Sequence, residues 1–367
     1  KEHYGIIRFT GIKNINERRS KMGRKQNNLL IIGGVPYNER PASFGGTTVL
    51  MQNFLEYCQK VGIPYDFVST NRYGGRMSAI RNLMQMFCGL LRYVWRCDCI
   101  MYNASSLTGP YLIYPIIFII GKLLGKKLVF RKFAGGFKNH LEQHWQVQKI
   151  VLFLLRHTNL SFFETKELVA FFKSKGVESV WFPNVRNRRV VPKTEKEMAE
   201  YSRRFVFMAH VRKTKGVGEL IDCFRHLSDD FQVDIYGRLD DFTEEELRGS
   251  NYRYKGLLKP QEVVDVLKKY DVLLLPSYME GYPGIIIEAY SVGVPAIATN
   301  VGGIPEILEE GETGFIIEPM QVSALEKAIK NIDEKNHLEM SKNALAFFDN
   351  FDAEIVNKRI LDQIMAL

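Results

Sequence analysis

Two glutamates separated by seven residues, Glu280 and Glu288, flank a segment whose residue types could bind an anion. Pro283 follows a turn-rich stretch and can open a helix, because the N–H that proline lacks has no partner in a first helical turn. The amides of Gly284 and Ile285 would then point out of the helix N-terminus, where the helix dipole favours a negative charge. The pattern predicts a phosphate-binding helix start between two carboxylates.

Glu288 lies about one helical turn further on, within the apolar stretch 285–292. A carboxylate in such surroundings is costly unless partners satisfy it, and the two hydroxyls of a ribose could be those partners. A sugar nucleotide would therefore fit both features, with its pyrophosphate at the helix start and its ribose on Glu288. The alternative is that Glu288 is a solvated helix residue and Glu280 an ordinary turn acid.

Basic residues follow an expected strand at 205–209, in the loop that carries His210, Arg212 and Lys215. Cations suit a site where a leaving nucleoside diphosphate accumulates negative charge. A second expected strand, 232–236, ends at Gly237, which we interpret as a turn on the phosphate side. The alternative interpretation of the first loop is a solvated basic surface.

Strand-like and helical segments alternate along the whole chain, which is the rhythm of parallel α/β sheets. In the first half we expect strands at 29–32, 65–69, 99–102, 127–131, 162–164 and 180–182, and helices at 48–61, 77–95, 111–124 and 166–175. In the second half we expect strands at 205–209, 232–236, 254–258 and 272–275, a helix at 261–269 and further helices after residue 323. Ligands of such sheets sit outside the carboxyl ends of the strands.

The stretch E-G-Y-P-G-I-I-I-E-A, followed by G-V-P-A-I-A-T and V-G-G-I-P-E-I-L, resembles the nucleotide-sugar signature of the retaining glycosyltransferases of family 4. Bacterial capsule and O-antigen polysaccharide enzymes are of this kind. The family has the GT-B fold, so the resemblance implies an α/β protein of two Rossmann-like doubly wound domains with an interdomain cleft. It also implies transfer of a sugar with retention of the anomeric configuration.

The resemblance assigns roles to individual residues. Glu280 would contact the donor sugar near its reacting face, and Glu288 would bind the ribose. Lys215 and Arg212 would neutralise the diphosphate, with His210 as the rival of Arg212 for the family's arginine position. The other donor contacts that it implies are Gly281, Tyr282, Gly284, Ile285, Gly237, Leu257 (through its backbone, near the nucleobase), Gly45 and Gly46.

The acceptor side is expected at the carboxyl end of the strand 127–131. Arg131, Lys132 and Phe133 would lie at the mouth of the first domain. Here the chain departs from the family pattern, because many members have a histidine where this chain has Phe133. The acceptor is expected to be a saccharide or a polyprenyl-pyrophosphate-linked glycan.

We expect four segments along the chain: a basic N-terminal extension at 1–26, an acceptor-side domain at 27–190, a nucleotide-sugar-binding domain at 191–350, and a helix at 351–367 that returns to the first domain. The stretch 185–202, rich in charged residues, is interpreted as the linker between the two domains. Size supports this division, because 367 residues can build two cores.

Charge is divided unevenly between the two halves of the chain. Residues 1–190 contain 29 Lys+Arg and 10 Asp+Glu, a net charge of +19, whereas the remaining residues contain 21 and 31, a net charge of −10. A basic half fits an anionic membrane surface or a lipid-pyrophosphate acceptor, although the charge could also serve solubility alone. No nucleic-acid motif accompanies it, so a nucleic-acid partner is not expected.

Other features narrow the chemistry and the location. No D-x-D motif is present, so we expect no metal or other cofactor, and a UDP-sugar is the favoured donor. The chain contains five cysteines, an odd number, and their spacing is not that of zinc ligands. Both observations favour a reducing compartment. The expected place is the cytoplasm, at the inner face of the cell membrane. Two alternatives remain: a sugar-nucleotide epimerase with a similar fold, and a non-catalytic partner subunit that only binds the nucleotide sugar.

Overall fold

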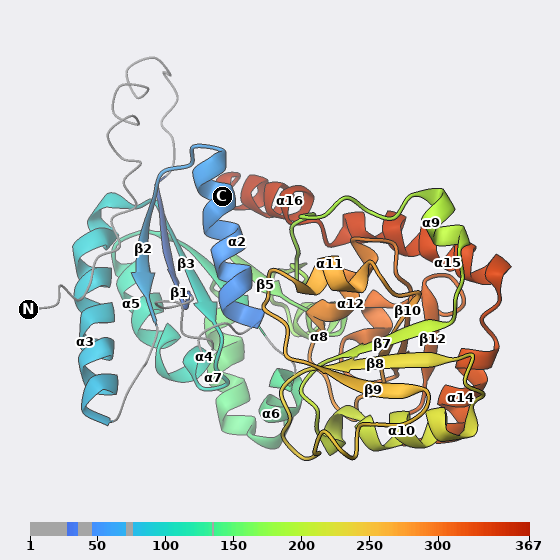
Figure 1. The fold of residues 1–367 in the computed structure, drawn as a ribbon. Helices are drawn as coiled ribbons and strands as arrows, with labels where there is room; N and C mark the ends of the chain where they lie inside the picture. Colours follow the sequence, from blue (N-terminus) through green and yellow to red (C-terminus); the bar gives the residue numbers. More distant parts are fainter. Residues whose placement is uncertain (1–27, 36–45, 71–75, 134–135) are drawn as a thin grey trace, which may run out of the picture.

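The computed structural model describes residues 28–35, 46–70, 76–133 and 136–367. It contains two six-stranded parallel sheets, both covered by helices (Figure 1). The expected α/β class is therefore confirmed. Gly45 and the expected extension at 1–26 lie outside the described residues.

The first sheet spans the N-terminal half of the chain, in the strand order β2-β1-β3-β4-β5-β6. Its strands are β1 (Leu29–Gly33), β2 (Tyr65–Ser69), β3 (Cys99–Ala104), β4 (Lys127–Lys132), β5 (Leu160–Phe163) and β6 (Ser179–Trp181). The helices are α2 (Gly46–Lys60), α3 (Arg76–Tyr93), α4 (Gly109–Leu112), α5 (Tyr114–Leu123), α6 (Phe137–Gln143), α7 (Trp145–Arg156) and α8 (Lys166–Ser174).

The second sheet has the strand order β12-β11-β10-β7-β8-β9. Its strands are β7 (Arg204–Met208), β8 (Gln232–Tyr236), β9 (Tyr252–Gly256), β10 (Val272–Leu275), β11 (Ala296–Thr299) and β12 (Gly314–Ile317). The helices are α9 (Glu195–Ala199), α10 (Val217–His226), α11 (Val263–Leu267), α12 (Gly284–Tyr290), α13 (Ile304–Ile307), α14 (Val322–Lys330), α15 (Glu334–Phe347) and α16 (Ala353–Met365).

Side chains on alternate positions of each strand enter two different cores, because successive residues of a strand point to opposite faces. In β1, Leu30 and Ile32 pack in the core that includes α3, α5, α7 and α8. Leu29 and Ile31 pack in a second core on the other face, together with α2 and α16. Parallel sheets that are buried on both faces need apolar strands of this kind.

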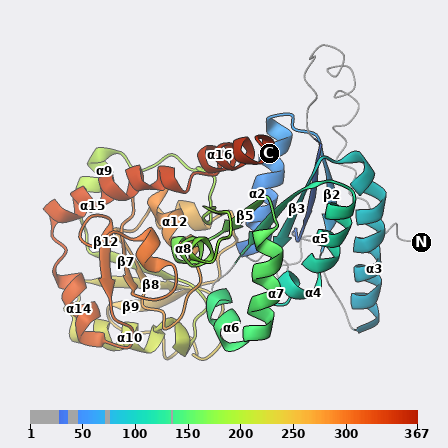
Figure 2. The same cartoon turned by 180° about the vertical axis from the view of Figure 1, so that it is seen from behind.

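The last helix, α16, leaves the second sheet and packs on α2 of the first (Figures 1 and 2). Val356 and Ile360 lie in the core beneath the first sheet, and Lys60 of α2 forms a 2.8 Å ion pair with Glu354. The chain therefore crosses between the two sheets once near residue 186 and again near residue 352.

Several elements differ from the expectation. The helix expected at 111–124 is divided into α4 and α5, with Pro115 in the first turn of α5. The strand expected at 254–258 is β9 and begins two residues earlier, at Tyr252. The expected linker contains α9, which starts with a capping box formed by Thr194 and Glu197. Thr165 caps α8, since its side chain accepts a hydrogen bond from the amide of Leu168.

Candidate active site

Lys215 and Glu280 meet at the carboxyl ends of β7 and β10. The ammonium Nζ of Lys215 lies 2.6 Å from Oε1 of Glu280, and the hydroxyl of Ser277 donates to the same oxygen at 2.8 Å. Both ionic side chains are largely buried. The loops that follow β7 and β10 thus hold a cation and a carboxylate together, and the second of these loops leads into α12.

Two glycines allow the surrounding loops to approach so closely. Gly216 has φ +72°, and a Cβ atom there would lie 1.9 Å from the carbonyl oxygen of Pro276. Gly302 has φ +57°, and its Cβ would lie 2.1 Å from the carbonyl oxygen of Glu280. Only glycine fits these conformations and contacts. Gly302 therefore directly supports the loop of Glu280.

Glu288 is paired with a residue that the sequence analysis had placed in the linker. Nε of Arg186 lies 2.5 Å from Oε1 of Glu288. A Cβ built on Gly284 would come within 1.7 Å of Nη2 of Arg186, so the guanidinium lies against the first residue of α12. The carboxylate therefore has the charged partner that its apolar surroundings require.

Arg186 is itself fixed from several sides. Its Nη1 donates to the side chain of Asn184 and, at 3.0 Å, to the carbonyl of Val185. Its amide donates to the carbonyl of Phe351, and its carbonyl accepts from the amide of Ala353, both at 3.0 Å. The strap from residue 184 to 187 is thus tied to the segment that enters α16.

The start of α12 is held by the first half of the chain as well. The side-chain amide of Asn184 donates to the carbonyl of Tyr282 at 3.0 Å. Pro283 is the N-cap residue and Gly284 the first helical residue, so the proline stands one position before the helix. The amides of Gly284 and Ile285 accordingly belong to the first turn, as expected.

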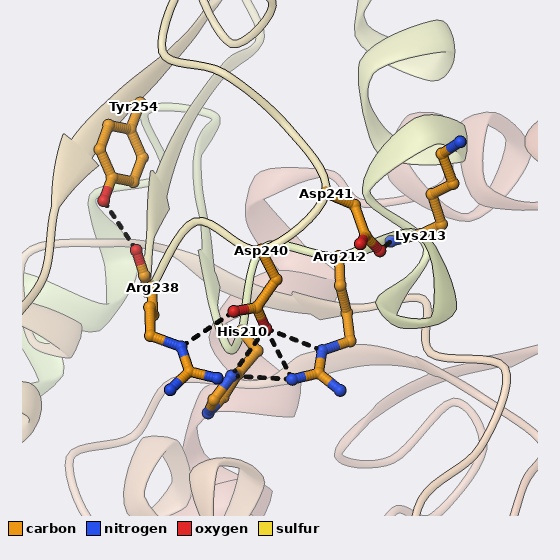
Figure 3. A network of polar contacts seen from close by, with 8 residues as sticks. His210, Arg212, Lys213, Arg238, Asp240, Asp241 and Tyr254 are labelled. Carbon is orange, nitrogen blue, oxygen red and sulfur yellow. Dashed lines mark hydrogen bonds and ion pairs between the residues drawn. The ribbon is translucent and has the colours of Figure 1, made fainter.

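His210 and Arg212, the two candidates for the family's arginine position, both contact the carboxylate of Asp240 (Figure 3). Oδ2 of Asp240 accepts from Nη2 of Arg212 at 2.6 Å and lies 3.1 Å from Nδ1 of His210. Its Oδ1 accepts from Nε of Arg238 at 2.9 Å. These contacts, led by the Arg238 hydrogen bond, hold the pKa of Asp240 far below the usual range.

The other predicted donor residues surround these groups. Gly237, with φ +145°, lies against the carbonyl of Ala209. The carbonyl of Gly281 accepts from the amide of Gly303 at 2.6 Å. Tyr282 is buried, Ile285 is half-buried, and Leu257 is exposed just after β9. Gly46 is the first residue of α2.

Arg131 and Lys132 do not line an open mouth, because both side chains are only 1% exposed. The guanidinium of Arg131 is stacked on the rings of Phe182 and Phe133, at 3.3 Å and 4.2 Å from their centroids. The ammonium of Lys132 donates to the carbonyl of Phe133. Burial lowers the pKa of Lys132 to about 8. These two cations are therefore packed inside the first domain.

A cavity of about 260 Å³ opens at the carboxyl ends of β1, β2 and β3. Among the residues that the structure describes, its lining is rich in hydroxyls and contains no charged side chain. Phe133, the third residue expected on the acceptor side, is part of this lining. The residues around it include Thr47, Thr48, Thr70, Tyr102, Asn103, Ser105, Ser106 and Thr108.

Residues 193–346 match the family model described as "Glycosyl transferases group 1". This segment is a group 1 glycosyltransferase domain. Within it lie Lys215, Glu280 and Glu288, together with the cluster on Asp240. Arg186 lies outside the matched segment.

Curated relatives match over parts of the chain. The N-acetyl-alpha-D-glucosaminyl L-malate synthase of Bacillus anthracis is 27% identical over 52% of this chain and 53% of its own length. The capsular polysaccharide biosynthesis glycosyltransferase CapM of Staphylococcus aureus is 29% identical over 41% of this chain and 42% of its own. The chain thus spans about half or less of the length of these relatives.

Solved structures resemble nearly the whole chain. HepE of Anabaena, solved in complex with UDP, has a TM-score of 0.71 and 15% identity over 93% of this chain and 100% of its own. The sucrose-phosphate synthase of Thermosynechococcus elongatus has a TM-score of 0.72 and 15% identity over 93% and 99%. At this identity the likeness concerns the fold alone, and it confirms the GT-B fold beyond the group 1 domain.

The sequence analysis missed Arg186, Asn184 and Asp240. Asn184 follows Pro183 at the end of β6 and was recognised only as the last element before the linker. Arg186 was one of several basic residues there, and nothing in its neighbours marks it as the partner of a glutamate 102 positions away. Asp240 had a usable signal, since it follows a strand end just beyond Gly237.

Proposed function

We propose that the protein is a glycosyltransferase that moves a sugar from a nucleoside-diphosphate sugar to a saccharide or a polyprenyl-pyrophosphate-linked glycan. A UDP-sugar is the favoured donor. The observation that carries the proposal is the ion pair of Lys215 with Glu280, in the loop that leads into the helix on which Arg186 holds Glu288. Such an arrangement offers a cation and amides to a diphosphate and carboxylates to sugar hydroxyls.

In the proposed reaction, the bond between the anomeric carbon and the diphosphate oxygen breaks, and the diphosphate leaves with the electron pair. The oxygen of an acceptor hydroxyl forms the new bond to the same carbon, and its proton is released. Lys215 stabilises the departing charge together with the amides of Gly284 and Ile285. Arg212 joins them when it turns from Asp240. We propose that the anomeric configuration is retained.

We propose that cations of the protein, without a resident metal, stabilise the leaving diphosphate. A charge-assisted contact from lysine or arginine to a phosphate can supply this stabilisation. Turnover should then be unchanged after treatment with EDTA. A loss of turnover that added Mg²⁺ or Mn²⁺ restores would contradict this part of the proposal.

Relatives support a role in cell-surface polysaccharide synthesis. CapM of Staphylococcus aureus is named for capsular polysaccharide biosynthesis, and TuaC of Bacillus subtilis is named as a putative teichuronic acid biosynthesis enzyme. A solved neighbour of the same fold contains UDP-glucose. We propose the cytoplasmic face of the cell membrane as the place of action, without a nucleic-acid partner. No helix in the described part of the chain is long and apolar enough to cross a bilayer.

The test is a panel of UDP-, GDP- and ADP-sugars, scored by thermal shift and by release of the free nucleoside diphosphate. One donor should raise the melting temperature and slowly release its diphosphate. Glu288→Ala should abolish the shift, whereas Glu339→Ala, at an exposed position of α15, should leave it unchanged. Conversion of a UDP-sugar to its epimer without an acceptor would favour the epimerase. Binding without any product would favour the partner subunit.

A further inference from the structure

Three neighbouring helices of the first domain, α3, α5 and α7, present large apolar side chains to the outside. They belong to the layer on the side of the sheet opposite α2 and α16. Both views show α3, α5 and α7 in this order along the domain (Figures 1 and 2). We call their outer surface the apolar layer, and define it by ten exposed residues: Met84, Leu91, Trp95, Leu112, Ile116, Ile119, Leu123, Trp145, Ile150 and Phe153.

Exposed apolar side chains follow one another along α4 and α5. Ile116, Ile119 and Leu123 are spaced by three and four, which places them on one side of α5, and Leu112 is the last residue of α4. All four are exposed, and Leu123 is 80% exposed. Ile113 and Ile117, between them, point into the core. The helix is therefore apolar on its inner and its outer side, which a helix facing only water would not need.

A similar series runs along α3 and the 3-10 turn Val94–Arg96 that follows it. Met84 and Leu91 of α3 and Trp95 of this turn are spaced by seven and four, and all three are exposed. Soluble monomers rarely expose contiguous apolar patches of more than a few hundred Å². Three neighbouring helices with such rows thus indicate a surface that something else covers.

The positive charge around the apolar layer indicates which kind of partner covers this surface. Residues 76–157, which contain the three helices, include 12 Lys+Arg and two acids, Asp98 and Glu142, a net charge of +10. Two of these cations, Arg131 and Lys132, are buried and do not contribute to the outer surface. Arg92, Lys122, Lys149 and Arg156 are exposed beside the apolar rows. Lysine and arginine can bury their methylene stems while their charged ends reach an anionic headgroup. A protein partner would meet charged residues at the centre of its interface, where they are usually depleted.

The tryptophans point to the same partner. Two of the three in the chain, Trp95 and Trp145, lie on the apolar layer and are 69% and 59% exposed. Lys149 lies 4.5 Å from the ring of Trp145. Tryptophan prefers the boundary between headgroups and acyl chains, where its ring is apolar and its N–H is hydrated.

We propose that the apolar layer is a docking surface for an anionic lipid bilayer. Helices α3, α5 and α7 lie in the plane of the membrane, their apolar rows enter the headgroup boundary, and the cations bind lipid phosphates. The hydroxyl-lined cavity ends at Ser106, Thr108 and Ile113, next to Leu112 of the layer. Docking therefore brings the cavity to the surface from which a lipid-linked glycan emerges, and this last step rests on the proposed function.

The experiment is flotation of the full chain with vesicles of phosphatidylcholine alone or with added phosphatidylglycerol. We expect binding to the anionic vesicles and at least about tenfold weaker binding to the neutral ones, since several basic residues contribute at the surface. Ile119→Glu with Leu123→Glu should weaken anionic-vesicle binding by at least about tenfold. Ile355→Glu, at a 53% exposed isoleucine of α16, is the matched control because Ile119 is 56% exposed, and it should bind like the wild type.

Equal flotation of the wild type and the Ile119/Leu123 variant, or no flotation of either, would overturn the proposal. The proposal would also be overturned if the wild type is a dimer and the same variant is a monomer, because the apolar layer would then be covered by a second copy of the chain. Release of diphosphate from a soluble donor separates this proposal from the proposed function. The Ile119/Leu123 variant should release diphosphate from the soluble donor at the wild-type rate. If the wild type binds vesicles but turns over no donor, the proposed glycosyltransferase activity is wrong and the docking surface still stands.

Discussion

Nε of Arg186 lies 2.5 Å from Oε1 of Glu288, so the strap that joins the two sheets holds the carboxylate expected to bind the ribose. The same arginine exchanges backbone hydrogen bonds with Phe351 and Ala353. Helix α12 is therefore connected through one side chain to both places where the chain passes between the sheets. We infer that Arg186 is a positioning residue, which fixes Glu288 without itself contacting the reacting atoms.

Arg186→Ala should weaken binding of UDP or the donor sugar by about threefold to tenfold. The effect is smaller than the roughly 1.5–3 kcal/mol of a direct charge-assisted hydrogen bond, because Arg186 acts only through the position of Glu288. KM for the donor should rise while kcat changes little. Arg186→Lys should restore part of the affinity, whereas Arg189→Ala, at an exposed arginine three residues further along the chain, should have no effect. Titration calorimetry with UDP measures the affinity, and unchanged or tighter binding by Arg186→Ala would contradict the role.

Lys215→Ala should lower turnover by roughly ten- to hundredfold, since it removes one charge-assisted contact from the leaving diphosphate. It also leaves Glu280 with Ser277 as a hydrogen-bond donor. Lys213→Ala provides the control, because Lys213 is an exposed lysine of the same turn. Steady-state release of the nucleoside diphosphate measures the effect. If the two variants lose the same activity, the loss reflects general charge and the assigned role is wrong.

Much of the fold could be predicted because its signal is local. The strands Tyr65–Ser69, Gln232–Tyr236 and Val272–Leu275 were expected with the bounds that the structure has. Val272–Leu275 is the continuous apolar segment typical of a buried parallel strand, whereas the other two alternate apolar with polar residues. The strand Tyr252–Gly256 was displaced by two residues in the prediction. Its exposed Arg253 and Lys255 give an edge strand that lacks such a run.

The candidate site was predictable only where the chemistry is carried by neighbours in sequence. Glu280, Pro283 and Glu288 lie on one continuous stretch, and their roles stay predictions. Arg131 and Lys132 were expected at an open mouth because they end a strand. Whether such a side chain is exposed depends on what packs over it, here Phe182 on Arg131, and this contact comes from a distant segment that local patterns do not specify.

Lys132→Met should stabilise the fold at neutral pH, and the gain should decrease as the pH rises. Burial lowers the pKa of Lys132 to about 8, whereas an unfolded lysine titrates near 10.4. Between these values the unfolded state binds more protons, so the stability of the wild type rises with pH. Urea unfolding between about pH 7 and 11 measures this slope, which the variant should lose. Lys173→Met, at an exposed lysine, should keep it.

Gly216→Ala and Gly218→Ala form a matched pair two residues apart. Gly216 has φ +72° and would place a Cβ atom 1.9 Å from the carbonyl of Pro276, whereas a Cβ on Gly218 meets nothing within 4 Å. Gly216→Ala should therefore lower the melting temperature and, because Lys215 is displaced from Glu280, reduce turnover. Gly218→Ala should stabilise helix α10 by about 0.5–1 kcal/mol, since alanine loses less backbone entropy in a helix. Thermal unfolding and diphosphate release measure both, and a Gly216→Ala protein with wild-type stability and turnover would show that the close approach of the two loops is not required.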